Sequence, residues 1–191
     1  MIPLDDSVKK RITGNSYPAY VQGDIAYEDL RHVTVWHIDF LGQEQKGEFI
    51  VNKAIAEDVC AIFYNLYQSA YPIEKIRLAE SYGCDDEASM ADNNTSAFHY
   101  RLVVGMEELS KHSFGLAIDV NPLYNPYIKD GVVMPANALE YVDREKEFPY
   151  KIDEYDLCYQ LFKEHSFAWG GDWADRPDYQ HFYKEKYKKG I

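Results

Sequence analysis

Several features are scarce or missing in this 191-residue chain, and each absence excludes a class of protein. It has three cysteines and no C-x-x-C pair, so nothing in it indicates a disulfide-stapled fold. No apolar run approaches the roughly 20 residues that a membrane-spanning helix requires. Basic residues are outnumbered by acidic ones, and the formal net charge of -12 argues against nucleic acid as a partner.

The N-terminus also lacks the apolar segment of a signal peptide, since Met1 to Gly14 is rich in charged residues. The sequence therefore leaves open a cytoplasmic chain and a chain whose leader was removed. Cys60 and Cys158 stand in helix-like apolar rows, which favours buried free thiols over a disulfide. There is no internal repeat and no low-complexity tract.

What the chain does have suits a single globular domain. Hydrophobic residues make up 46% of it and aromatic residues 15%, and its length allows a sizeable core. Gly14, Pro18 and Gly23 punctuate residues 1–30, which we expect to form an irregular N-terminal arm. Residues 31–191 are then the domain proper.

Residues 33–40 alternate with the period of a strand, and residues 48–51 return after a glycine-containing turn, which predicts a hairpin. The apolar side chains of one face are Trp36, Ile38 and Phe40. On this alternation, His37 points away from the apolar face and into solvent.

The remaining elements are predicted from caps, breakers and apolar spacing. They are a helix over 53–69 capped by Asn52, a short strand over 75–81, a polar loop over 82–95, a strand over 116–120, a long connection over 131–150, and a helix from Asp153 to His165. Strands and helices are mixed without regular alternation, so the predicted fold class is α+β, with a small antiparallel sheet and flanking helices.

The stretch from His112 to Asp119 carries the strongest chemical signal. The two residues are seven positions apart, so in one continuous strand their side chains would point to opposite faces. Both can reach one ion only if His112 lies on a loop and the chain turns at Gly115 into the strand over 116–120.

Imidazole and carboxylate are both good ligands for a catalytic zinc, which typically takes three protein groups and leaves one position for water. The C-terminal part offers a third ligand, because Asp178 precedes His181 by three residues after a glycine-rich turn. A metal lowers the pKa of water and a nearby carboxylate takes the proton, which is the chemistry of metal-assisted hydrolysis.

Two segments carry a family resemblance: Ser-Lys-His-Ser-Phe-Gly-Leu-Ala-Ile-Asp at 110–119, and Trp-Gly-Gly-Asp-Trp at 169–173 with Asp-Tyr-Gln-His-Phe at 178–182. They resemble those of the zinc-dependent peptidoglycan peptidases, the D-alanyl-D-alanine carboxypeptidases and L-alanyl-D-glutamate endopeptidases. This family is related in fold to the Hedgehog signalling domain and to lysostaphin-like enzymes. The Trp-Gly-Gly-Asp-Trp segment is similar to the endopeptidase-like branch. The resemblance covers roughly residues 75–185 and implies a zinc peptidase domain over 31–191.

The resemblance implies one zinc ion on His112, Asp119 and His181, with Asp178 as general base where many relatives have glutamate. The family uses an arginine to stabilise the oxyanion. The usual arginine after the strand is missing here, and Arg101 is the nearest substitute, with an ordinary ion pair as the alternative.

The remaining candidate positions each have two interpretations. Ser110 is a substrate contact or a plain loop serine. Trp169, with other aromatic residues near the C-terminus, walls the cleft as a substrate contact or packs beneath it. Asp172 orients a ligand histidine or caps a turn. The other four histidines are taken as ordinary structural residues: His32, His37, His99 and His165.

The sequence thus predicts zinc-dependent hydrolysis of an amide bond in a peptidoglycan stem peptide, without fixing which bond is cut. A non-catalytic zinc module that binds a cell-wall peptide or a protein partner is the first alternative. A metal-free structural domain is the second. Secretion or location in the cell envelope is implied by the resemblance, and the oligomeric state is open.

Overall fold

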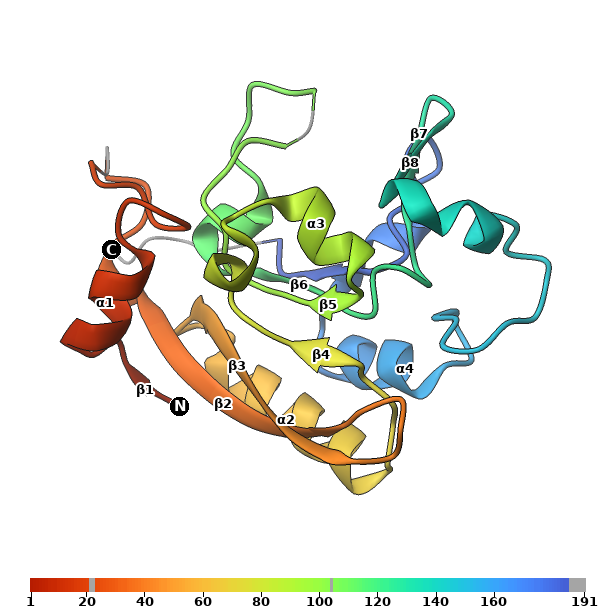
Figure 1. The fold of residues 1–191 in the computed structure, drawn as a ribbon, viewed down its shortest axis with the longest axis horizontal. Helices are drawn as coiled ribbons and strands as arrows, with labels where there is room; N and C mark the ends of the chain where they lie inside the picture. The colour runs from red at the N-terminus through yellow and green to blue at the C-terminus, as the bar shows by residue number, and fades with distance from the viewer. Residues whose placement is uncertain (21–22, 104, 186–191) are drawn as a thin grey trace.

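The computed structural model describes residues 1–20, 23–103 and 105–185, and its longest feature is an antiparallel hairpin. Strands β2 (Leu30–Ile38) and β3 (Glu44–Asn52) pair from end to end and lie across helix α2 (Ala56–Gln68) (Figure 1). The predicted hairpin and helix are confirmed. The helix begins later than expected, because Asn52 does not cap it: its side chain accepts from the Ala54 amide and donates to the Phe114 carbonyl.

The prediction that His37 faces solvent is wrong. Its side chain is on the buried face of β2 with Val33 and Val35, and its Nδ1 lies 2.7 Å from the Ile73 carbonyl oxygen. Trp36, on the other face, is 53% exposed. Both faces of this strand carry apolar side chains, so the alternation alone did not decide which face α2 would cover. Burial lowers the pKa of His37.

Residues at the N-terminus are more ordered than an irregular arm. Strand β1 (Ile2–Pro3) pairs with β2, and helix α1 (Asp6–Ile12) is capped by Asp5. The apolar side chains of this part form a second core with the back of the hairpin: Leu4, Val8, Ile12, Tyr17, Ile25, Leu30, Ile50, Leu78 and Phe98. The expectation of an irregular arm is therefore wrong, whereas a domain boundary near residue 30 stays a prediction.

The segment expected to be a polar loop contains helix α3 (Asp86–Ala91) and strand β5 (Asn94–Thr95). Its acidic residues begin the helix: the Asp85 side chain accepts from the Ala88 amide as the N-cap. Strand β4 (Lys75–Ile76) pairs with β5 in parallel and is shorter than predicted. A 3₁₀ helix, η2 (Ala79–Tyr82), follows β4.

A second sheet has the strand order β6-β10-β9 and is antiparallel. Its strands are β6 (Ala117–Asp119), β9 (Ala168–Trp169) and β10 (His181–Tyr183). Helix α4 (Leu157–Glu164) packs with α2 and this sheet in the main core. The helix was predicted, but its cap is Asp156 and not Asp153.

The predicted long connection is partly structured. Strand β8 (Val132–Met134) lies in it and forms a small hairpin with the preceding strand β7 (Tyr127–Lys129) at the upper right of Figure 1, and 3₁₀ helix η4 (Ala136–Tyr141) follows. The remaining 3₁₀ helices are η1 (Tyr27–Asp29), η3 (Lys111–Phe114) and η5 (Gly170–Asp172).

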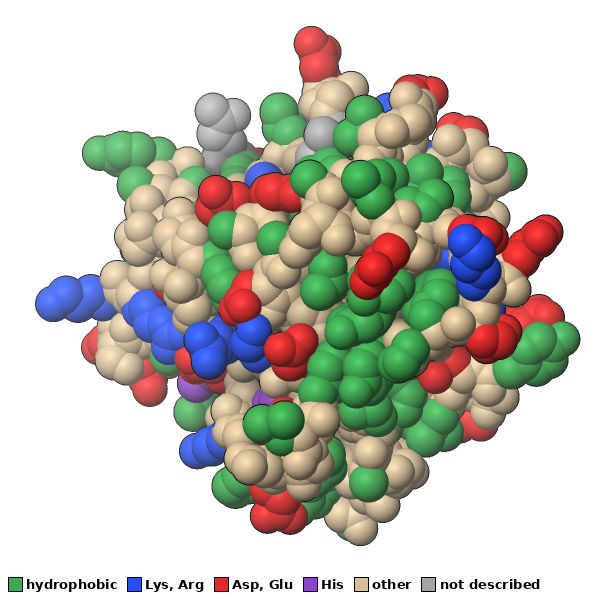
Figure 2. Space-filling model, turned by 45° about the vertical axis from the view of Figure 1, so that its right-hand side comes forward, with side chains coloured by type: hydrophobic (Ala, Val, Ile, Leu, Met, Phe, Trp, Pro, Cys, Tyr) green, Lys and Arg blue, Asp and Glu red, His purple; other side chains and the backbone are tan. Residues whose placement is uncertain are grey.

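Small antiparallel sheets with helices packed on them confirm the α+β prediction at this coarse level. The likeness to the Hedgehog and D-Ala-D-Ala peptidase fold stays a prediction. Among the described residues, no helix is long and apolar enough to cross a membrane, and all three cysteines are free. Hydrophobic side chains gather at the centre of the face shown in Figure 2, with acidic side chains spread around them.

Candidate active site

The turn between His112 and Asp119 forms as the spacing predicts. His112 lies in η3, which Ser110 caps by accepting from the His112 amide. Gly115 follows with φ +64°, and a Cβ there would come within 2.7 Å of the Asn52 backbone nitrogen. The chain then enters β6, which ends at Asp119. Glycine is required at this position both for its positive φ and for the close approach of the hairpin.

Strand pairing brings the third residue to this turn. His181 stands opposite Asp119 in the β6–β10 register, so their side chains share a face. The Asp119 Oδ1 is 2.8 Å from His181 Nδ1, and its Oδ2 is 3.1 Å from His112 Nε2. The two imidazole nitrogens are 3.2 Å apart. All three side chains are buried.

These distances suit a tetrahedral metal ion. Ligand atoms about 2.0–2.2 Å from a tetrahedral zinc lie about 3.3–3.6 Å from one another. The nitrogen and oxygen atoms of His112, Asp119 and His181 are 2.8 to 3.2 Å apart, somewhat less than this distance. Three protein ligands leave a fourth tetrahedral position, as catalytic zinc sites do.

The hydrogen bond made by the other ring nitrogen of His112 also supports a metal ion at this place. Its Nδ1 contacts the Ala97 carbonyl oxygen, which accepts a hydrogen and so fixes the proton on Nδ1. The lone pair of Nε2 then points at the Asp119 carboxylate, so these two acceptors need either a metal cation between them or a second proton on the imidazole. Burial alone would raise the pKa of Asp119, but His112 and His181 outweigh it and hold the pKa far below its usual value.

A cavity of about 430 Å³ opens above the three residues. Its wall is largely polar or aromatic and includes Asp86, Arg101, Ser110, Tyr127, Trp173, Arg176, Asp178 and Gln180. A cavity of this size, with a few convergent polar groups, is typical of a site for a small molecule or a short peptide.

Asp178 lies in this wall beside His181, whose amide donates to the Asp178 carbonyl oxygen at 3.2 Å. Gly170 packs against both residues, and a Cβ there would meet the Asp178 carbonyl oxygen at 2.7 Å. The Asp178 Oδ1 is buried and has no hydrogen-bond partner among the described residues. Burial raises the pKa of this carboxyl to about 7, so it is suited to accept a proton near neutral pH.

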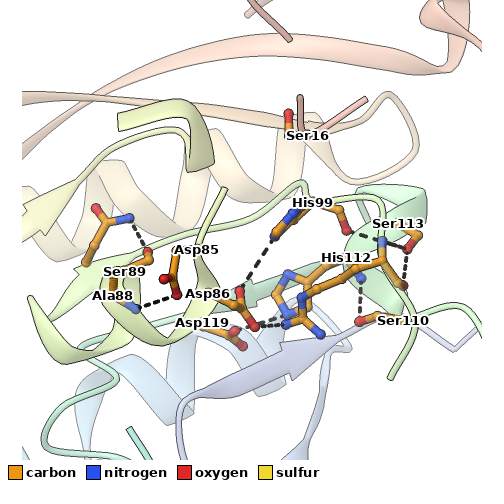
Figure 3. A network of polar contacts seen from close by, with 12 residues as sticks. Ser16, Asp85, Asp86, Ala88, Ser89, His99, Ser110, His112, Ser113 and Asp119 are labelled. Atoms are coloured by element: carbon orange, nitrogen blue, oxygen red, sulfur yellow. Dashed lines mark hydrogen bonds and ion pairs between the residues drawn. The ribbon is translucent and has the colours of Figure 1, made fainter. Parts of the chain in front are cut away.

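Arg101 lines the cavity and also makes an ion pair, so the predicted ion pair is present, whereas its role toward the oxyanion stays a prediction. Its guanidinium is 2.6 Å from Asp86. The Ser113 hydroxyl fixes the Arg101 backbone by accepting from its amide and donating to its carbonyl (Figure 3). Burial raises the pKa of Asp86, but His99 and Arg101 outweigh it and lower the pKa overall. Asp86 was missed in the sequence because it stands in the stretch over 82–95, whose many Asp and Asn residues indicated a loop.

Trp169 does not line the cavity. It belongs to the main core, where its indole nitrogen donates to the Tyr179 carbonyl oxygen at 2.9 Å. Of its two interpretations, the position of Trp169 therefore fits packing beneath the site. Trp173 lines the cavity instead. Asp172 does not orient a ligand histidine: its carboxylate is 3.6 Å from Lys163.

The other histidines lie outside the three-residue group. His32 pairs with Glu48 and His165 with Asp58. His99 is 3.7 Å from Asp86 and contributes to the ion-pair network next to the cavity (Figure 3).

A buried His-Asp-His group at the base of a polar cavity is a candidate metal centre. Residues 104–184 match the family model of the D-alanyl-D-alanine carboxypeptidases, and this range contains His112, Asp119, Asp178 and His181 but not Arg101. The comparisons with curated proteins and with solved structures gave no match. The family match confirms the resemblance seen in the sequence: over these residues, which make up less than half of the chain, the protein is similar to this peptidase family.

Proposed function

We propose that the protein hydrolyses an amide bond in peptidoglycan stem peptides with one zinc ion, as a D-Ala-D-Ala carboxypeptidase or an L-Ala-D-Glu endopeptidase. The observation that carries this proposal is the convergence of His112, Asp119 and His181 below a cavity whose wall holds the unpaired carboxylate of Asp178. The family match over the same residues supports it.

The three ligand side chains would hold the zinc ion, which when bound polarises a carbonyl and lowers the pKa of water. Asp178 takes the proton of the attacking water and passes it to the leaving amine. Its raised pKa suits both transfers, because a group that titrates near pH 7 gains and loses a proton readily there. Arg101, held by Asp86, stabilises the negative charge that develops on the substrate oxygen.

The test is the cleavage of defined stem peptides by the zinc-loaded protein, followed by mass spectrometry. Product from the wild type, with none from Asp178→Asn or after chelation, supports the proposal, and the masses identify the bond. Intact peptides of every stem type from a fully zinc-loaded protein would favour the alternative, a non-catalytic zinc module that binds a cell-wall peptide or a protein partner. Absence of stoichiometric zinc, with folding unchanged in His112→Ala, would leave a structural domain.

The proposed substrate also indicates where in the cell the protein acts. Peptidoglycan lies outside the cytoplasmic membrane, so we propose that the protein acts as a secreted or cell-envelope enzyme. Fractionation of producing cells, with the protein detected by antibody, checks this: a purely cytoplasmic protein would contradict it.

A further inference from the structure

Buried polar atoms without a hydrogen-bond partner are concentrated at the cavity. Among the described residues five such side-chain atoms occur, and four belong to residues of the cavity wall. They are Arg101 Nε, Tyr127 Oη, Asp178 Oδ1 and Gln180 Oε1. An unpaired buried polar group costs stability, so such a concentration indicates a site whose partners come from a ligand.

Tyr127 supplies the only hydroxyl among these four groups, and the proposed chemistry does not yet use it. Its position beside Asp178 is fixed by the backbone. The two residues face each other in an antiparallel bridge, and the Ile128 amide donates to the Pro177 carbonyl next to it. Directly opposed residues in an antiparallel pair point their side chains to the same face. The phenol is longer than the carboxylate, so its hydroxyl extends further from the shared backbone than the Asp178 oxygens.

The chemistry of a phenol at this place suits a donor. Burial and the nearby charge of Asp178 raise the pKa of Tyr127, so the hydroxyl keeps its proton at neutral pH. Asp178 and Gln180 offer acceptor oxygens in the same wall, whereas Tyr127 and Arg101 offer donors. Donors and acceptors together complement a peptide group, which has one carbonyl oxygen and one N–H.

We propose that Tyr127 is a further catalytic residue of this peptidase, whose hydroxyl donates a hydrogen bond to the carbonyl oxygen of the scissile amide. The bond strengthens as that oxygen becomes an oxyanion, and no covalent bond to Tyr127 forms. This inference rests on the proposed function. Donors of this kind typically contribute about 100- to 1,000-fold to turnover.

The test is Tyr127→Phe in the zinc-loaded protein, with Tyr124→Phe as the control, since Tyr124 packs among Phe40, Tyr141 and Tyr150 outside the cavity wall. We expect kcat of Tyr127→Phe to fall about 100-fold with little change in KM. Thermal stability should be no lower than that of the wild type and zinc content should be equal, because the hydroxyl removed has no partner in the described structure. The control should retain full activity.

A second readout does not depend on turnover. Calorimetric titration with a phosphinic stem-peptide analogue, whose tetrahedral oxygen stands in for the oxyanion, should show weaker binding to Tyr127→Phe by a factor similar to the loss in kcat. Unchanged activity and unchanged analogue affinity in Tyr127→Phe would overturn the inference while leaving the peptidase proposal intact. A Tyr127→Phe protein that loses stability or zinc would also overturn it. A wild type that cleaves no stem peptide overturns the proposed function as well.

Discussion

Asp119 of β6 and His181 of β10 lie directly opposite each other in an antiparallel pair, with Oδ1 of the carboxylate 2.8 Å from Nδ1 of the imidazole. A single strand register therefore joins two candidate ligands that are distant in the sequence, and the short turn at Gly115 adds His112. The hydrophobic core beneath, with Ile118 and Phe182 buried on the opposite face, fixes that register.

Replacement of Asp119 by asparagine should abolish tight zinc binding, because the amide keeps the shape but loses the charge between the two imidazoles. We expect one zinc per chain in the wild type by elemental analysis, and a loss of affinity of more than about 100-fold in the variant. His165→Gln is the matched control, since His165 pairs with Asp58 away from the group. Equal zinc content in Asp119→Asn and wild type would contradict the site.

Gly170→Ala should disturb the site through packing. The added Cβ would lie 2.7 Å from the Asp178 carbonyl oxygen and 3.1 Å from His181 Cβ, so the backbone must move. We expect a loss of about 1–3 kcal/mol in the free energy of unfolding, measured by urea denaturation, and weaker zinc binding.

Gly42→Ala is the control for that variant, because its Cβ would meet nothing within 4 Å although φ is +75°. It should lose about 1 kcal/mol from backbone strain alone and bind zinc normally. Normal zinc binding in Gly170→Ala would show that the close packing of Gly170 does not hold Asp178 and His181 in place.

Asp86→Asn should lower peptide hydrolysis without removing the metal. The substitution takes away the carboxylate 2.6 Å from the Arg101 guanidinium, which then loses its fixed position in the cavity wall. We expect kcat/KM to fall about 10- to 100-fold at unchanged zinc content. Asp92→Asn, which breaks the Lys75 pair elsewhere, serves as the control. Wild-type kinetics in Asp86→Asn would show that the ion pair is only structural.

Stability should depend on pH through Asp156. Burial raises the pKa of this carboxyl to about 6, above its unfolded value, despite hydrogen bonds from Tyr71 and two backbone amides. A raised folded pKa gives stability that is complete below pH ~4 and is lost as the pH rises through about 6.

Asp156→Asn keeps the helix cap but does not titrate. The difference in unfolding free energy between wild type and this variant should therefore fall between pH 4 and pH 7, by no more than about 3 kcal/mol. Chemical denaturation across this range measures it. A difference that stays constant, or rises with pH, would show that burial does not raise this pKa.

Local patterns predicted the elements whose signals lie within one segment. The hairpin, α2, α4 and the turn at Gly115 follow from alternation, helical spacing and a glycine, because these depend on backbone geometry over a few residues. The same reasoning failed for α3, where aspartates that suggested a loop serve as the cap and first turn of a helix. Composition alone does not distinguish an aspartate in a loop from one that caps a helix.

Packing across the chain decided the rest. His37 is buried because α2 covers one of two apolar faces, and residues 1–20 are ordered because they share a core with the back of the hairpin. The sequence by itself determined which side chains could hold a metal ion, since ligand chemistry belongs to the residue type. Only the tertiary structure decided that Asp86, Tyr127 and Gln180 line the same cavity, because burial and strand register arise from contacts between distant segments.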